Sequence, residues 1–548
     1  MFFRNKAEQS ATHKLQWGYD TAFNKSVTWA AHPVATMAAK GPFDTYLPIT
    51  PVREASIPRA WFYVLILGAM ASFYIWEARY LYLDDAFIHL RIAKNLLDHG
   101  FYSFNGDFPT YCTSSPLFTA LLALCSQFVS TPNLPKIVGV LIYSVLFAVI
   151  ASRVLTATTP YARWSWIAFL AAVGSPLAMR WLADGMETGL SGIVALLLAD
   201  AAFEIYSESK PISAATVIGF TTLGLLASTL RIEFSLLIGL IGIATLTRFQ
   251  RRGIDPRAIA LAAGSVAGFS VIFGIFGRIL PDTAIAKSHA LTNMPWTVAA
   301  FTTLMNIGKA HAAASSLGTI VVLGVIGSFL SALRTACDRY FMAVINAGFA
   351  VVLFLVVWRQ QAIQGYRYFV FIEFFLFAFN IAILNASRNI HEKAAIAVRP
   401  RGGLNSSVVA ILLGVAFVGW QAFDLYKLRT ISAGRAISFQ KFENASLSDL
   451  RGTYGIAWDV GMIGYFSQAR ILDGNGLVDG IDVARMTRPD RLRSFVTEHP
   501  VRFVFVDAPQ LAGLKGFIDV SHWAVRETFD FPNFAGDPDR HFLMVRQD

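Results

Sequence analysis

Two adjacent carboxylates, Asp84 and Asp85, follow the first apolar stretch of the chain that is long enough to cross a membrane. Carboxylates at a membrane boundary are costly in free energy, so their presence there favours a functional role. Such a carboxylate can accept a proton from a hydroxyl group or bind a cation. If a helix begins at Asp84, Arg91 lies on the same side of it, roughly 10 Å further along the axis. That gap could hold a sugar or a phosphate group between a base and a cation.

A structural alternative exists for the same pair. Asp84 could be a helix N-cap that satisfies free N–H groups, with Asp85 solvated. On this helix a step of 100° per residue separates a polar face from an apolar face, and we expect the apolar face to lie in lipid. The polar face holds Arg91, Lys94, Asn95 and Asp98, and the apolar face holds Leu90, Ala93, Leu96 and Leu97.

Other polar groups fall at the ends of later apolar segments. Glu187 stands at the head of one segment, and Arg231 and Glu233 interrupt another. Arg231 and Glu233 could simply pair with each other inside a helix bundle. Glu187 could cap a helix. Their shared position at membrane boundaries favours a joint functional role.

Two cations and a histidine continue this pattern. Lys287 and His289 end the apolar segment that starts near residue 257, and Arg367 begins a further segment. Lys287 and Arg367 are candidates for binding phosphate, although anchoring at the membrane interface is an equally common use of such residues. For His289 an ordinary exposed position is favoured.

The composition defines the class of protein. Of 548 residues, 55% are hydrophobic and only 15% are charged, which predicts a polytopic α-helical membrane protein. The formal net charge is +10, but the basic residues lie in short clusters between apolar runs, so we exclude nucleic acid as a partner. Three scattered cysteines exclude a disulfide framework and a thiolate metal site.

About twelve apolar segments are long enough to be considered as membrane spans. The first, 61–80, follows a basic stretch, so residues 1–59 are expected to form a cytoplasmic tail and the loop 81–113 to lie outside. The basic loop after Arg248 should be cytoplasmic, so the chain must cross the membrane an odd number of times between the loop 81–113 and Arg248. Six apolar segments lie between them, so one of the six does not span. The best candidates are 114–130 and the region of Arg231. We therefore expect about eleven crossings, with a transmembrane domain over 60–425.

After residue 425 charged residues, Gly and Pro return. Residues 426–548 are expected to form an extracytoplasmic α/β domain, with strands at 501–506 and 541–545 and a helix over 488–498. Aromatic side chains there could stack on sugar rings or pack within a small core. These aromatic residues are Trp458, Tyr465, Phe466 and Trp523.

The order of these motifs resembles the GT-C membrane glycosyltransferases, and within them the subgroup of mycobacterial arabinofuranosyltransferase B. The resemblance covers most of the chain from about residue 60. This sequence differs from the family's pattern in two places. The usual Arg-Pro-Glu appears as Arg231-Ile232-Glu233, and the usual Gly-Tyr-Thr before the second helix appears as Thr110-Tyr111-Cys112-Thr113. The matching motifs are Asp84-Asp85, Phe104-Asn105-Gly106, Thr113-Ser114-Ser115-Pro116, Gly185-Met186-Glu187-Thr188, Arg231-x-Glu233, Leu280-Pro281-x-Thr283 with Lys287, and Asp459 to Asp479.

This resemblance implies transfer of a sugar from a polyprenyl-phosphate donor in the lipid bilayer to a hydroxyl of an extracytoplasmic glycan or glycoprotein, in the inner (plasma) membrane of a bacterium. The sugar expected is D-arabinofuranose. Asp84 is the expected general base and Asp85 orients the acceptor. The expected donor phosphate ligands are Lys287, Arg367, Arg231 and Arg91, and the expected substrate-positioning residues are Glu187, Glu233, His289 and Asn105.

Other functional classes stay open on the sequence. No cofactor is required, while a divalent cation held by Asp85 is possible. A transporter or flippase of a lipid-linked glycan would also carry charges among many helices, but these would be expected near the middle of the bilayer. A non-catalytic scaffold that kept the GT-C framework would bind the donor without turnover.

Overall fold

The computed structural model describes residues 83–158, 160–207, 212–248, 253–288, 295–335, 339–360, 367–391, 406–532 and 538–547. The chain divides into two units, 1–53 and 54–548, and every described residue belongs to the second. The expected cytoplasmic tail and the apolar stretch 61–80 lie outside the described residues.

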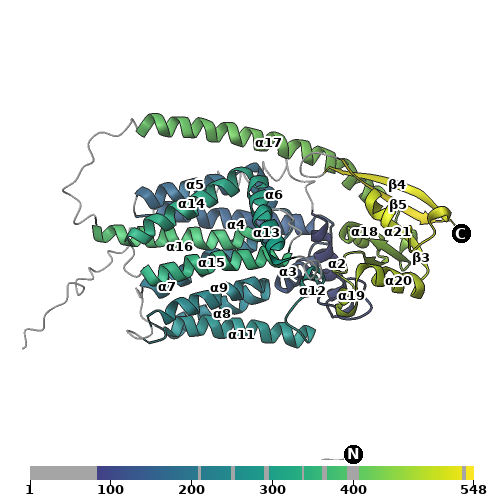
Figure 1. Ribbon diagram of the computed structural model, residues 1–548, viewed down its shortest axis with the longest axis horizontal. Coiled ribbons are helices and arrows are strands. Elements are labelled where there is room, and N and C mark those ends of the chain that lie inside the picture. Colours follow the sequence, from purple (N-terminus) through teal and green to yellow (C-terminus); the bar gives the residue numbers. More distant parts are fainter. Residues whose placement is uncertain are drawn as a thin grey trace, which may run out of the picture. The chain divides into compact units, whose positions relative to one another are not determined.

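Long apolar helices form the centre of the described chain (Figure 1). Among the described residues four are long and apolar enough to cross a membrane, and a fifth span is possible if α5 and α6, which meet at 76°, form one broken span. The four are α4 (Leu134–Thr156), α7 (Thr188–Ser207), α11 (Pro256–Phe276) and, within α16 (Arg367–His391), the stretch Phe369–Ala386. The chain is therefore a multi-pass membrane protein, as its composition predicts.

The remaining helices of this region pack against those spans. α8 lies against α11, and α14 lies against α16. α13 had no counterpart among the apolar segments expected from the sequence. The further bounds are α3 (Pro116–Ser126), α5 (Pro160–Val173), α6 (Pro176–Leu182), α8 (Ala214–Leu230), α9 (Glu233–Leu246), α12 (Asp282–Ser288), α13 (Trp296–Ala313), α14 (Ser315–Thr335) and α15 (Arg339–Gln360).

α3 has 11 residues and is too short to cross a bilayer core of about 30 Å. It occupies the segment 114–130, one of the two expected not to span. The total of eleven crossings stays a prediction.

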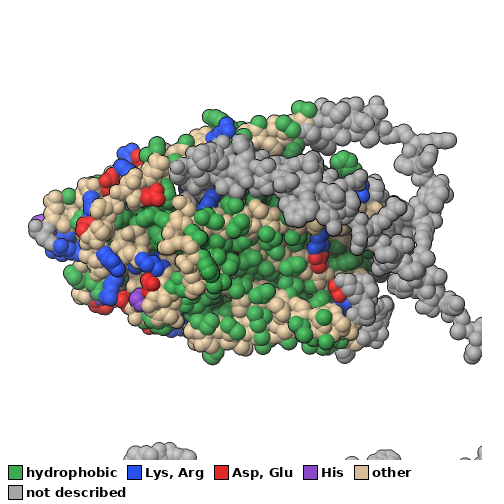
Figure 2. All heavy atoms as spheres, turned by 180° about the vertical axis from the view of Figure 1, so that it is seen from behind, with side chains coloured by type: hydrophobic (Ala, Val, Ile, Leu, Met, Phe, Trp, Pro, Cys, Tyr) green, Lys and Arg blue, Asp and Glu red, His purple; other side chains and the backbone are tan. Residues whose placement is uncertain are grey.

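The surface over the helices is apolar. Figure 2 shows hydrophobic side chains over much of the helical region and most of the charged side chains over the C-terminal part of the chain. Leu141, Trp164 and Val266 are each more than 60% exposed on this surface. Large side chains of this kind are stable in contact with lipid rather than water, so the distribution fits a bilayer around the helices.

α2 (Asp84–His99) corrects the expectation of an interfacial helix with one face in lipid. It packs against α3 and against α18 (Val460–Ser467) of the C-terminal part. Leu90 and Ala93 are buried, but Arg91 and Asn95 on the other face are buried as well. The reason is that Arg91 and Asn95 donate hydrogen bonds to the loop that follows α2 instead of facing water, while Asp98 on the same face is exposed.

The C-terminal part contains a five-stranded mixed sheet in the order β2-β1-β3-β5-β4. β1 pairs in parallel with β2 and β3, while β5 pairs antiparallel with β3 and β4. The described residues of this part combine a sheet with helices, which is consistent with the expected α/β arrangement, and a helix and two strands lie where they were expected at 488–498, 501–506 and 541–545. The bounds are β1 (Tyr454–Ala457), β2 (Arg470–Asp473), α19 (Ile481–Arg485), α20 (Arg488–Glu498), β3 (Val501–Asp507), α21 (Ala508–Leu514), β4 (Trp523–Pro532) and β5 (Pro538–Arg546).

The boundary expected between residues 425 and 426 lies inside α17 (Ser406–Asn444). This helix is continuous, and its last turns carry Phe439 and Phe442, which are buried against the C-terminal sheet region. The return of charged residues after 425 therefore marks a change of environment along one helix rather than a break in the chain.

Candidate active site

A cavity of about 560 Å³ lies where α2 meets the ends of several long helices. Its polar lining comes from α2, from the loop before α3, from the turn before α7, and from the first residues of α9 and α16. Its apolar lining comes from α9, α11 and α15 and the residues around α12. The polar residues include Asp85, His89, Thr113, Ser114, Glu187 and Arg367, and the apolar residues include Ile232, Leu236, Phe269, Leu355 and Val356.

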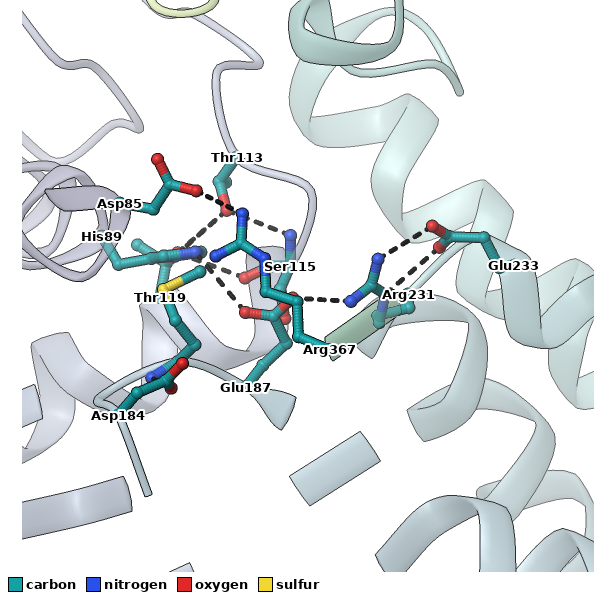
Figure 3. A network of polar contacts seen from close by, with 11 residues as sticks. Asp85, His89, Thr113, Ser115, Thr119, Asp184, Glu187, Arg231, Glu233 and Arg367 are labelled. Carbon is teal, nitrogen blue, oxygen red and sulfur yellow. Dashed lines mark hydrogen bonds and ion pairs between the residues drawn. The ribbon is translucent and has the colours of Figure 1, made fainter. Parts of the chain in front are cut away.

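Asp85 and Arg367 form an ion pair across this cavity (Figure 3). Asp85 lies in the first turn of α2, where its negative charge also interacts favourably with the N-terminal end of the helix dipole. Its side chain is 24% exposed, whereas that of Arg367, the first residue of α16, is only 4% exposed. Asp85 thus offers a carboxylate to the cavity, and Arg367 offers a positive charge beside it.

Three charged residues form a buried chain next to this pair. Arg231 donates to Glu187 at 3.0 Å and to Glu233 at 2.9 Å, so one guanidinium joins two carboxylates (Figure 3). The side chain of Arg231 is 1% exposed, and its guanidinium lies 5.1 Å from the centroid of the Phe371 ring. Charges this deeply buried are tolerated only when they are paired in this way.

The turn before α7 directs Glu187 into the cavity. Gly185 has a φ of +94°, and a Cβ there would lie 3.2 Å from Pro135 and 3.3 Å from Ala86. A side chain would be strained at this φ and crowded, so glycine is required. Asp184 accepts the N–H of Met186 at 3.0 Å, which fixes the same turn.

His89 lies one helical turn after Asp85 on α2. Its Nδ1 is 2.7 Å from the Thr119 hydroxyl and 3.2 Å from that of Thr113, and its Nε2 is 3.8 Å from Glu187 Oε2. Burial lowers the pKa of His89 in spite of the nearby carboxylates, which favours the neutral imidazole. A neutral ring with its proton on Nε2 would accept a hydroxyl hydrogen at Nδ1 and direct the Nε2 proton towards Glu187.

Asp84, the expected general base, does not line the cavity. Its two carboxylate oxygens accept the N–H groups of Gly461 at 2.6 Å and Met462 at 2.7 Å, at the start of α18. A Cβ on Gly461 would lie 1.9 Å from the Asp84 carbonyl oxygen, so glycine is needed for this contact. Burial, together with the Asp459 charge, raises the pKa of Asp84 to about 8. Asp84 therefore joins α2 to the C-terminal part. It satisfies free N–H groups at a helix start, as in the structural alternative considered for the sequence, but the helix is α18 and not its own.

Arg91 and Asn105 have connecting roles of the same kind. Arg91 donates to the carbonyls of Phe104, Gly464 and Ala469. The Asn105 amide accepts the N–H of Ile471 and donates to its carbonyl, both at 3.0 Å. Neither residue is among those that line the cavity, and the expected phosphate-binding role of Arg91 and substrate-positioning role of Asn105 stay predictions.

The structure brings Asp85, Glu187, Arg231, Glu233 and Arg367 together. Lys287 lies in the last turn of α12, but its side chain is not among those described, and His289 lies outside the described residues. Within the described part of the chain no group of three His, Cys, Asp or Glu residues is placed to hold a metal ion.

Sequence reasoning did not select His89, Thr113 or Asp184 as site residues. A signal for His89 was present, because a residue four positions after Asp85 lies on the same face of a helix. Thr113 and Asp184 stood inside motifs that were noted, but nothing in the sequence showed that Thr113 would contact His89.

Comparison with solved structures relates the chain to a known fold. No family model matches the chain, and no curated protein matches it. The crystal structure of ArnT from Cupriavidus metallidurans bound to undecaprenyl phosphate is similar to this structure with a TM-score of 0.51 over 88% of this chain and 98% of that chain. The two sequences are 12% identical. The chain therefore shares the overall fold of ArnT.

Proposed function

We propose that the protein is a membrane glycosyltransferase that transfers a sugar from a polyprenyl phosphate to a hydroxyl group. The observation that supports this best is the cavity in which the Asp85 carboxylate and the Arg367 guanidinium lie next to an apolar lining. A lipid-phosphate sugar has the matching parts, since its chain is apolar and its phosphate is anionic, and the acceptor hydroxyl that attacks its sugar needs a base beside it.

The fold supports the lipid-linked donor. ArnT, which shares the fold, was crystallised with undecaprenyl phosphate. In this chain Leu236, Phe269 and Val356 line the cavity from α9, α11 and α15. These helices also carry exposed apolar side chains, Ile243, Val266 and Val351 among them. A prenyl chain could therefore reach the cavity sideways from the bilayer while its phosphate stays near Arg367.

The reaction assigned to this geometry is a single displacement. The acceptor oxygen attacks C1 of the sugar, and the bond between C1 and the phosphate oxygen breaks, its electron pair leaving with the polyprenyl phosphate. The acceptor proton passes to Asp85. Arg367 stabilises the negative charge that grows on the phosphate. We assign the role of base to Asp85 rather than Asp84, because Asp85 reaches the cavity. One displacement inverts the configuration at C1.

The finer features rest on the resemblance of the sequence motifs to arabinofuranosyltransferase B. We propose D-arabinofuranose as the sugar, an extracytoplasmic glycan or glycoprotein as the acceptor, and the bacterial inner membrane as the location. The site then faces the extracytoplasmic side, where the loop 81–113 is expected to lie. Asp85 could also hold a divalent cation, which a chelator series would reveal.

A transfer assay tests the proposal. The full chain in lipid nanodiscs would be offered a panel of radiolabelled polyprenyl-phosphate sugars, decaprenyl-phosphate arabinofuranose among them, with octyl arabinofuranosides as acceptors. We expect transfer from at least one donor and loss of transfer in Asp85→Asn. Asp98→Asn is the matched control, since Asp98 is exposed at the other end of α2. Donor binding without transfer would contradict the proposal and favour a scaffold, and donor movement across the bilayer would favour a flippase.

A further inference from the structure

The C-terminal part of the chain contributes a residue to the cavity. Leu477, in the loop between β2 and α19, lines the cavity together with Asp85, Cys112 and Thr113. Among the described residues that line it, Leu477 is the one that comes from beyond α17. A side chain from the sheet region, more than a hundred residues away from every other lining residue in sequence, thus forms part of the wall.

The loop that carries Leu477 is held in one conformation. Asp473 accepts the N–H of Asn475 at 2.7 Å and that of Leu477 itself at 2.8 Å. Asp479 accepts the N–H of Asp473 at 2.8 Å, so the two ends of the loop are joined. Bonds of this kind between a short acidic side chain and the nearby backbone define tight turns.

A second set of contacts fixes the loop from outside. Arg491 of α20 donates to the carbonyl of Gly474 at 3.1 Å. A Cβ on Gly476 would lie 2.3 Å from the Arg491 guanidinium carbon, and Gly476 has a φ of +69°. Only glycine fits both conditions without strain. Asn105, from the loop after α2, holds β2 at Ile471 immediately before the loop.

The lining of the cavity is of two kinds. Leu236, Phe269 and Leu355 line it from α9, α11 and α15, with Glu233 and Ser235 as polar groups at the start of α9. The loop before α3 and the Leu477 loop also line it, and they lie outside the long apolar helices. A glycan acceptor is soluble in water, so these loops suit its approach better than the apolar helices do.

We propose that Leu477 is a specificity-determining residue that limits the size of the acceptor admitted beside Asp85. This inference rests on the proposed function and names the acceptor side of the same cavity. Because hydrogen bonds hold its loop, Leu477 acts as a fixed part of the wall, and a change in its volume alters the space in the cavity that Asp85 also lines.

Substitutions that change this volume in both directions test the proposal. Leu477→Trp should raise the KM for an octyl tetra-arabinofuranoside by about tenfold, since each unfavourable contact of about 1.4 kcal/mol costs that factor. The dissociation constant for decaprenyl phosphate should stay the same. Leu477→Ala should raise kcat/KM for the tetrasaccharide relative to the monosaccharide by about threefold. Asn475→Trp adds similar bulk at an exposed position of the same loop and should change neither value.

The outcomes separate this inference from the proposed function. Transfer by the wild type, with Leu477→Trp and Asn475→Trp giving the same KM, would overturn the inference alone. The same would follow if Leu477→Trp weakened donor and acceptor equally. Absence of transfer from every donor by the wild type would overturn the proposed function and this inference together. If Leu477→Trp does not fold, the ratio measured with Leu477→Ala decides.

Discussion

The carboxylate of Asp85 and the guanidinium of Arg367 pair with each other inside the cavity, although 282 positions separate them in the chain. In the proposed reaction each has a different partner, the acceptor hydroxyl for Asp85 and the donor phosphate for Arg367. A donor phosphate therefore competes with Asp85 for the same guanidinium. Binding of the donor would release the Asp85 carboxylate for the acceptor, which implies that the donor binds first.

This competition predicts opposite effects of Asp85→Asn on binding and on turnover. Loss of the base should lower kcat by roughly a hundredfold or more. Removal of the competing carboxylate should lower the dissociation constant for decaprenyl phosphate by about threefold, because Arg367 becomes available to the phosphate. Binding of labelled decaprenyl phosphate to nanodiscs measures the second effect. Weaker donor binding in Asp85→Asn than in the Asp98→Asn control would refute the competition.

Arg367→Met should weaken donor binding. A charge-assisted hydrogen bond to phosphate contributes about 1.5–3 kcal/mol, so the dissociation constant should rise by about tenfold or more. Arg367→Lys should restore part of the lost donor affinity, because lysine keeps the positive charge but lacks the second N–H donor of the planar guanidinium. Arg493→Met, at an exposed position of α20, is the control for a lost arginine. Equal donor affinity in wild type and Arg367→Met would remove Arg367 from the phosphate site.

Arg231 should be needed mainly for stability. Replacement of Arg231 by Met would leave the carboxylates of Glu187 and Glu233 buried without the cation between them. Breaking a buried ion pair in this way costs about 3–5 kcal/mol. Unfolding of the purified protein in mixed micelles by SDS would measure the change. The double substitution Arg231→Met with Glu233→Gln should recover part of the loss, and no recovery would show that the two residues are not coupled.

Asp84 should govern stability in a pH-dependent way, separately from catalysis. Burial raises its pKa from the ordinary value of 3.8 to about 8, beside the charges of Asp459, Asp85 and Arg435. Its contribution to stability is therefore complete below pH 3.8 and is lost as the pH rises through about 8. The thermal midpoint of the wild type should fall more between pH 5 and pH 9 than that of Asp84→Asn. Parallel curves for the two proteins would contradict this role.

The elements that could be predicted from the sequence are those whose type and ends are determined by residues close together in the chain. The helix 488–498 was found because Pro489 and Asp490 mark its start, and β3 because it is a continuous run of strand-forming residues. α13 was missed since Asn306, Lys309 and His311 interrupt its apolar character. Neighbouring residues could not show which of Asp84 and Asp85 reaches the cavity. That depends on the N–H groups of Gly461 and Met462, more than 370 positions further along the chain, which bind the Asp84 carboxylate.

A single-turnover transfer assay with Asp84→Asn and Asp85→Asn side by side tests the central claim most directly. Both proteins would be loaded with saturating decaprenyl-phosphate arabinofuranose and mixed with an octyl arabinofuranoside acceptor. The predicted result is a rate for Asp84→Asn within a few-fold of the wild type and a rate for Asp85→Asn lower by roughly a hundredfold or more. Loss of transfer in Asp84→Asn, with Asp85→Asn unaffected and both folded, would contradict the assignment of Asp85 as the base.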